Sequence, residues 1–233
     1  MNILAIETTE RIGSVAAMRD GQIICERSLD DSQRSAQSLA PAVKALWVEV
    51  GWQPQDVDLV AVTVGPGSFT GLRVGIATAK TLAFCCGAEI LGIDTLETIA
   101  AAAPSDVERL EVAIDAQRNE VVMQKFHRGS DGRFEPDQDP ARLVDIDDWL
   151  ENLQSGTVIS GPILKKLANR LPKSVTPLPP EQSRPTAANI ARLAACHYAD
   201  GRRDDVWKLV PVYSRQSAAE EKWAEKTANG KIE

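Results

Sequence analysis

The sequence predicts an α/β protein of two lobes related by internal duplication, each lobe a mixed β-sheet with helices packed against it. Short apolar runs alternate along the chain with segments whose apolar residues recur every three or four positions, as alternating strands and helices do. The chain also repeats a pattern. Residues 3–18 and 111–126 both read as a strand ending in Ala-Ile-carboxylate, a polar turn and an outgoing strand, so Asp115 corresponds to Glu7.

The first lobe is expected over residues 1–104. Three antiparallel strands open it, because Asp20-Gly21 between two strand-like runs is a strong hairpin signal. A helix follows, since apolar residues step by three and four from Ala36 to Val50, with Pro41 tolerated inside it. The remaining segments are a strand over 57–64, a helix over 70–86, a strand over 88–93 and a helix that Asp94 caps, reaching about residue 103.

The second lobe is expected over residues 105–205. After the repeated strand pair, its pattern predicts a helix over 145–153, a strand over 157–160, a helix over 162–170 and a helix from the Thr186 cap to Tyr198. Residues 206–233 become polar and rich in Lys and Glu after Tyr213, which predicts a partly flexible tail.

Composition excludes several classes of protein. The 233 residues are 43 % hydrophobic and 25 % charged, which is typical of a globular chain rather than a disordered, collagen-like or coiled-coil one. The formal net charge of −7 argues against this chain gripping a nucleic-acid backbone alone. Neither a long apolar span nor a signal-peptide pattern is present in the sequence, so we expect a cytoplasmic protein without membrane attachment.

A glycine-rich segment, Gly65 to Gly75, follows a predicted strand and opens a predicted helix. Such a turn offers free N–H groups to an anion, although its spacing matches neither a Walker loop nor the dinucleotide fingerprint. A tight turn that lets backbones pack closely is the alternative. Together with the polar end of the first strand, this segment supplies our candidate nucleotide or phosphate contacts: Glu7, Thr8, Thr9, Gly65, Gly67 and Ser68.

Small residues recur at every fourth position of the helix over 70–86. They form a smooth ridge that lets another helix or a sheet approach closely, and the first helix presents an aliphatic face beside it. Packing on the protein's own sheet would use the same pattern, but we expect an interface with a partner chain. Its candidate residues are Ala36, Leu39, Val43, Leu46, Trp47, Gly71, Gly75, Ala79 and Ala83.

The sequence offers little for metal binding or catalysis. His127 and His197 are the two histidines, and they form neither an H-x-x-x-H nor an H-E-x-x-H pair. The four cysteines fit neither a zinc site nor a disulfide framework. Glu7 and Asp115 would have to meet across a cleft to act as acid and base. We therefore predict neither a metal site nor catalytic residues.

Taken together, the opening ILAIETT, the segment GPGSFTGLRVGIATAKTLA, the Asp115-Ala116 turn and the run Pro211 to Arg215 resemble the bacterial TsaB (YeaZ) family over essentially the whole chain. The resemblance implies the two-lobed actin-like, Hsp70-like (ASKHA) fold. Catalytic relatives bind metal with an H-x-x-x-H pair on the first helix, whereas this chain has Gln33 to Ser38 there without histidine.

The resemblance also implies a function. Family members pair with a TsaD-like catalytic subunit and assemble with a TsaE-like ATPase, and the assembly transfers threonylcarbamoyl to N6 of the adenosine next to the anticodon in tRNAs that read ANN codons. The TsaB-like chain would be a non-catalytic activator without a cofactor of its own. ATP and Mg²⁺ would act at the partner subunits, tRNA would be contacted only indirectly, and the chain alone would form a homodimer. The alternative is a small-molecule kinase or ATPase of the same fold that uses Glu7, Thr8, the Gly65–Ser68 loop and Asp115.

Overall fold

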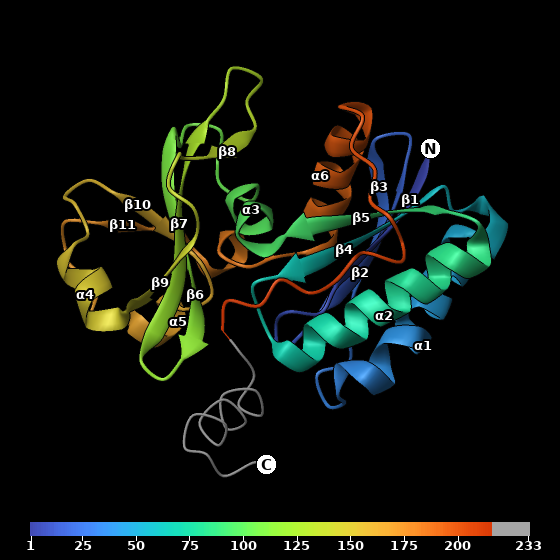
Figure 1. Cartoon of the computed structure of the whole chain (residues 1–233), viewed down its shortest axis with the longest axis horizontal. Helices are drawn as coiled ribbons and strands as arrows, with labels where there is room; N and C mark the ends of the chain where they lie inside the picture. The colour runs from blue at the N-terminus through green and yellow to red at the C-terminus, as the bar shows by residue number, and fades with distance from the viewer. Residues whose placement is uncertain (216–233) are drawn as a thin grey trace, which may run out of the picture.

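The two-lobed α/β architecture is confirmed by the computed structural model, which describes residues 1–215 (Figure 1). The first lobe carries a five-stranded sheet in the order β3-β2-β1-β4-β5. Strands β1, β4 and β5 run parallel, while β2 is antiparallel to β1 and β3. The strands are β1 (Asn2–Glu7), β2 (Ser14–Arg19), β3 (Gln22–Ser28), β4 (Leu59–Gly65) and β5 (Glu89–Asp94).

Helices cover both faces of this sheet. Side chains alternate along each strand, so Leu4 and Ile6 of β1 join the core under α1 (Ser35–Val50) and α2 (Phe69–Cys86). Ile3 and Ala5 face the opposite way, against α6 (Ala187–Ala199). Burial on both faces explains why the strands read as continuous apolar runs. A 3₁₀ turn, η1 (Pro54–Asp56), joins α1 to β4.

The second lobe is built on a sheet in the order β11-β10-β6-β7-β8, with β9 paired to β7. Two short helices, α4 and α5, pack on one face of it, and α3 (Thr95–Ala100) packs on the other. The remaining elements are β6 (Arg109–Gln117), β7 (Glu120–Arg128), β8 (Phe134–Pro136), β9 (Arg142–Asp145), α4 (Ile146–Glu151), β10 (Val158–Ser160), α5 (Leu164–Leu167), β11 (Thr176–Pro177) and η2 (Pro180–Gln182).

The sheet topology supports the predicted duplication. Read from β8, the second sheet runs β8-β7-β6-β10-β11, which repeats the first order β3-β2-β1-β4-β5 strand for strand. The antiparallel pair β6–β7 corresponds to β1–β2, and the parallel pair β6–β10 corresponds to β1–β4. Asp115 near the end of β6 therefore occupies the place of Glu7 at the end of β1.

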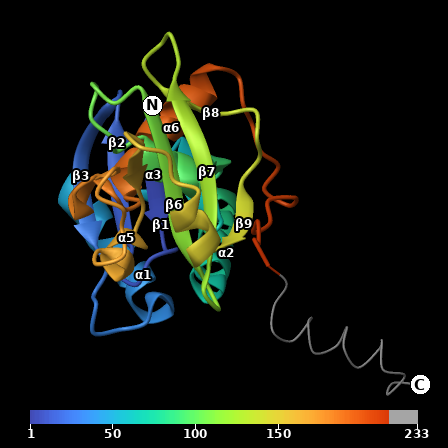
Figure 2. The ribbon, with the colours of Figure 1, turned by 90° about the vertical axis from the view of Figure 1, so that its left-hand side faces the viewer.

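The last helix crosses back to the first lobe. Although α6 lies within the stretch assigned by sequence to the second lobe, its Ile190 and Ala191 pack against Ile3 and Leu59 of the first sheet. The helix contacts β1 and β2, and Figure 1 shows it on the side of the first sheet, away from β10 and β11. Figure 2 views the molecule from the side of the second lobe. The first lobe thus consists of the N-terminal segment together with α6.

One predicted helix is much shorter than expected. The pattern predicted residues 162–170, but α5 spans only Leu164–Leu167. Gly161 before it has a φ of +126°, and a Cβ there would lie 1.8 Å from the carbonyl oxygen of Ala113, so β6 constrains the entry of the chain. After Leu167 the chain closes a turn onto the carbonyl of that residue, which ends the helix.

Within residues 1–215, the helices are all too short or too polar to cross a membrane.

Candidate functional site

A cleft of about 880 Å³ lies between the lobes. The first lobe contributes the β1–β2 turn and the start of α2, and the second contributes the end of β6 and the start of α5. Residues 213–215, which follow α6 in sequence, form a further part of the wall. The cleft therefore joins segments from the beginning, the middle and the end of the described chain.

The glycine-rich segment packs against the turn after β1. Ser68 caps α2, and its Oγ accepts a hydrogen bond from the N–H of Gly71 at 3.2 Å. The Ser68 N–H donates to the carbonyl of Thr9 at 3.3 Å. A Cβ on Gly67 would lie 2.6 Å from the Cβ of Thr9, so glycine is needed for this close approach. Among the predicted nucleotide contacts, the cleft brings together Thr9, Gly67 and Ser68.

The other three predicted contacts do not line the cleft, which corrects the sequence prediction. Glu7 is fully buried, and its Oε1 accepts hydrogen bonds from the N–H and Oγ1 of Thr9, both at 2.5 Å. Thr8 is also buried and donates its hydroxyl to the carbonyl of Gly71 at 2.8 Å. Gly65 faces the carbonyl oxygen of Val212. These three residues are buried in the first lobe and are not among the residues that line the cleft.

The pKa of Glu7 is raised above its usual value. Burial raises the pKa of Glu7 to about 7, against the opposing effect of its bonds from Thr9. Its second oxygen, Oε2, has no hydrogen-bond partner among residues 1–215. Ionising a buried carboxyl group is costly, so in the folded protein Glu7 stays protonated up to about pH 7.

This raised pKa predicts how stability depends on pH. Because the folded pKa of about 7 lies above the unfolded value of 4.5, the contribution of Glu7 to the free energy of unfolding falls as pH rises from about 4.5 to about 7. Glutamine does not ionise, so we expect the free energy of unfolding of Glu7→Gln to lack this fall of about 3 kcal/mol. The variant should therefore be more stable than the unmodified protein at pH 8. Urea unfolding of both proteins between pH 4.5 and pH 8 tests this expectation. Parallel pH profiles would contradict it.

On the second-lobe side, Asp115 pairs with a residue that the sequence analysis missed. Its Oδ2 lies 3.0 Å from Nζ of Lys166 in α5, and its Oδ1 accepts from the N–H of Gln117 at 2.8 Å. The acid–base pair considered for Glu7 and Asp115 is not formed, because Glu7 is enclosed in its own lobe and Asp115 is engaged by Lys166. Lys166 is one of two adjacent lysines in α5, whose sequence is Leu-Lys-Lys-Leu. Nothing in this short sequence indicates that one of the lysines lies at the cleft.

The chain after α6 forms a strap, residues 206–215, that runs along α2 (Figure 1). Lys80 of α2 donates to the carbonyls of Trp207 and Leu209, and the N–H of Val212 donates to the carbonyl of Val64 at 2.7 Å. This part of the predicted tail is therefore held against the first lobe. The remainder, residues 216–233, lies outside the described residues.

The strap ends by joining the two lobes. The ring of Tyr213 stacks on Phe69 with 4.3 Å between centroids, and Nε of Arg73 donates to its hydroxyl at 2.9 Å. Two residues later, Arg215 forms an ion pair with Glu120 of β7. A segment anchored on α2 is thus fastened to the second lobe at the cleft.

Most residues predicted to form a partner interface are inside the first lobe, which is a second correction. Leu39, Val43 and Leu46 point into the core under α1. The small-residue ridge of Gly71, Gly75, Ala79 and Ala83 is buried against the protein's own strands. A Cβ on Gly71 would lie 1.9 Å from the carbonyl oxygen of Thr8, and one on Gly75 would lie 2.3 Å from its Oγ1.

Other residues form the outer surface of these two helices, which lie side by side in Figure 1. Of the predicted set, Ala36 is exposed and Trp47 is half-buried. We name the exposed side the α1–α2 face and define it by Ala36, Ala40, Lys44, Val48, Ala77 and Thr81. Residues 1–215 contain no group of three or more His, Cys, Asp or Glu side chains arranged to hold a metal ion.

Comparison with known proteins gave consistent matches. The TsaD family model, described as tRNA N6-adenosine threonylcarbamoyltransferase, matches residues 29–177. The tRNA threonylcarbamoyladenosine biosynthesis protein TsaB of Bacillus subtilis is 30 % identical, and the alignment covers 97 % of this chain and 99 % of that protein. TsaB of Escherichia coli is 29 % identical, with coverage of 94 % and 96 %. The solved structure of YeaZ from Pseudomonas aeruginosa superposes with a TM-score of 0.78 at 26 % identity, covering 91 % of this chain and 99 % of YeaZ.

Proposed function

The chain belongs to the TsaB (YeaZ) family and takes part in tRNA threonylcarbamoyladenosine biosynthesis, and from this premise we propose that it is a non-catalytic subunit that docks onto a TsaD-like catalytic subunit and activates it. The assembly transfers threonylcarbamoyl to N6 of the adenosine next to the anticodon in ANN-decoding tRNAs. A TsaE-like ATPase is its third component. ATP and Mg²⁺ act at the partner subunits. In the absence of these partners, the chain pairs with a second copy of itself.

The observation that carries the proposal is the exposed α1–α2 face. Ala40 and Ala77 are small, and the side chain of Val48 is 75 % exposed. Small side chains permit another helix to approach closely, and each Å² of apolar surface that docking buries contributes about 25 cal/mol. The helices themselves are held firmly from below by the lobe core, so the face is a rigid docking surface.

Activation in this proposal is a shift in the partner's conformations. Docking that fits the active conformation of the catalytic subunit better than its inactive ones raises the active population without any chemistry on this chain. The net charge of −7 supports an indirect relation to tRNA, with phosphate contacts made chiefly by the partner.

An omission experiment tests the proposal. Purified TsaD-like and TsaE-like partners, threonylcarbamoyl-adenylate, ATP, Mg²⁺ and tRNA are combined with and without this chain, and the modified adenosine is counted. We expect modification to require the chain, while the chain alone modifies nothing. Equal modification without the chain would contradict the proposal, and modification by the chain alone would show that it is catalytic.

A further inference from the structure

The large apolar residues that are most exposed gather on one surface of the protein. Within residues 1–215, those exposed by more than half lie on α1, on α2 or on the strap, namely Val48, Phe84, Trp207, Val210 and Val212. We name the last four of these the strap patch. Exposed apolar residues that gather in this way mark a surface of interaction with another molecule.

The strap patch continues the α1–α2 face. Phe84 follows Ala77 and Thr81 along α2 at steps of three and four residues, so the three residues lie on one side of the helix. Phe84 is 68 % exposed and Trp207 is 71 % exposed, and their rings meet edge to face with 5.8 Å between centroids. The face on the two helices therefore extends to the strap through this aromatic pair.

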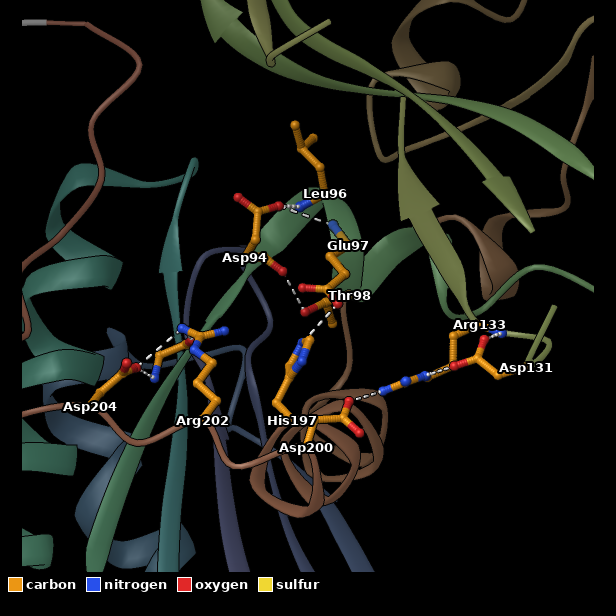
Figure 3. A network of polar contacts seen from close by, with 11 residues as sticks. Asp94, Leu96, Glu97, Thr98, Asp131, Arg133, His197, Asp200, Arg202 and Asp204 are labelled. Carbon is orange, nitrogen blue, oxygen red and sulfur yellow. Dashed lines mark hydrogen bonds and ion pairs between the residues drawn. The ribbon is translucent and has the colours of Figure 1, made fainter. Parts of the chain in front are cut away.

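Hydrogen bonds hold the strap in place at its start and along its length. Just before the strap, Arg202 donates to the carbonyl of Gly92 in β5 at 2.5 Å, and Asp204 accepts from the N–H of Gly92 at 2.8 Å (Figure 3). Lys80 of α2 then donates to two backbone carbonyls of the strap, at 3.3 and 3.2 Å. A partner that binds here does not have to immobilise the segment, which lowers the entropic cost of binding.

The α1–α2 face is too small to form a stable interface without such an extension. A stable interface uses roughly 20–30 residues of each partner. The α1–α2 face is defined by six residues, and alanine, lysine and threonine make up all but Val48. Binding energy in interfaces is concentrated on a few anchors, which are often tryptophan or tyrosine. Phe84 and Trp207 therefore supply the additional apolar area and the aromatic anchors that the face lacks.

The charges beside the patch indicate the chemistry of the partner surface. Helix α2 and the strap contain four basic residues and neither Asp nor Glu. Arg73 donates to a tyrosine hydroxyl and Lys80 donates to backbone carbonyls, so these bonds do not neutralise either charge. Lys208 lies 3.7 Å from Asp205, but its side chain is 85 % exposed and accessible to a partner. Carboxylates on the opposing surface would complement these positive charges.

We propose that the strap patch anchors the interface with the TsaD-like subunit, and that the opposing surface of that subunit is an apolar pocket edged by carboxylates. Phe84 and Trp207 enter the pocket, while Arg73, Lys80 and Lys208 face its edge. This inference rests on the docking proposed above and extends it from the two helices to the strap.

Truncation of the aromatic anchor tests the proposal, with the full-length chain and the purified subunit. We expect Trp207→Ala to weaken binding at least about thirtyfold, and Trp207→Phe to retain most of the affinity. Because Trp207 is exposed, its truncation leaves the fold intact, and unfolding curves of the variants check this. Leu143→Ala, at an exposed apolar position of β9 in the second lobe, is the control and is expected to leave binding unchanged.

Charge reversal at Lys208 tests the carboxylates of the partner. We expect Lys208→Glu to slow association with the subunit at least about threefold at low salt, because like charges then meet at the edge of the pocket. Lys173→Glu, at an exposed lysine of the second lobe, is expected to leave the association rate unchanged. Equal association rates for Lys208→Glu and the unmodified chain would overturn the assignment of carboxylates to the partner surface.

The outcomes separate this inference from the docking on which it rests. If the unmodified chain binds the subunit and Trp207→Ala binds it equally well, the strap patch is not the anchor, although docking itself stands. If Trp207→Ala weakens only the self-association of the isolated chain, the patch belongs to a contact between two copies, and the proposal is again overturned. If the unmodified chain does not bind the subunit, both this inference and the proposed docking fail.

Discussion

Replacing Gly71 with alanine is expected to destabilise the first lobe by about 3 kcal/mol or more, despite the higher helix propensity of alanine. The added Cβ would lie 1.9 Å from the carbonyl oxygen of Thr8, and this oxygen belongs to the backbone immediately after β1. Relief would require α2 to move away from the sheet that it covers. Urea unfolding measures the effect, and Thr70→Ala, at the exposed neighbouring position, is expected to change stability little.

Gly75 provides a matched comparison with a different outcome. A Cβ there would meet Oγ1 of Thr8 at 2.3 Å, which is a side-chain atom that can be removed. We expect Gly75→Ala to cost about 1–3 kcal/mol and Thr8→Ala to recover part of that cost in the double variant. Thr8→Ala is expected not to rescue Gly71→Ala, because the backbone carbonyl remains. Wild-type stability in both glycine variants would show that α2 does not need this close approach.

A single charge on the α1–α2 face is expected to abolish docking. Ala77→Glu places a carboxylate on the exposed side of α2, where it leaves folding nearly unchanged but must lose its water when a helix packs over it. We expect affinity for the TsaD-like subunit to fall at least a hundredfold and tRNA modification in the complete assay to fall with it. Calorimetric or surface-based binding with the purified partner measures the first effect.

Ala199→Glu is the matched control, since it makes the same change at an exposed position near the end of α6, away from the proposed face. Normal binding by Ala199→Glu together with loss of binding by Ala77→Glu would locate the interface. Full affinity of Ala77→Glu would show that docking uses another surface. Variants of Gly75 or Ala79 cannot answer this question, because both residues are buried inside the lobe.

The order of strands and helices could be predicted because it depends on local periodicity. The Asp20-Gly21 turn, the Asp94 cap and the Thr186 cap each signal their element within a few residues, and the structure confirms the caps at both α3 and α6. The repeated strand pair predicted the second sheet. What periodicity does not encode is which sheet a helix covers, so the return of α6 to the first lobe was missed.

The candidate site was predicted only in part, for two physical reasons. A ridge of small residues looks the same in sequence whether its neighbour is another chain or a turn such as that at Thr8, so Gly71 and Gly75 were assigned to the wrong surface. Residues that complete the cleft, such as Lys166 and Tyr213, come from segments far along the chain. The sequence also does not show whether a polar residue at the end of a strand is buried or exposed. Glu7 is an example, because it is fully buried.

The return of α6 has a consequence for how this protein is made. While a ribosome is still producing residues 105–186, α6 has not been synthesised and one face of the first sheet is uncovered. Ile3, Leu59 and Leu91, which pack with α6 in the folded protein, are exposed on that face during this time. The N-terminal half therefore cannot complete its fold in the order of its synthesis. It leaves the ribosome with an exposed apolar surface that favours aggregation, and it completes its fold only after almost the whole polypeptide has been synthesised.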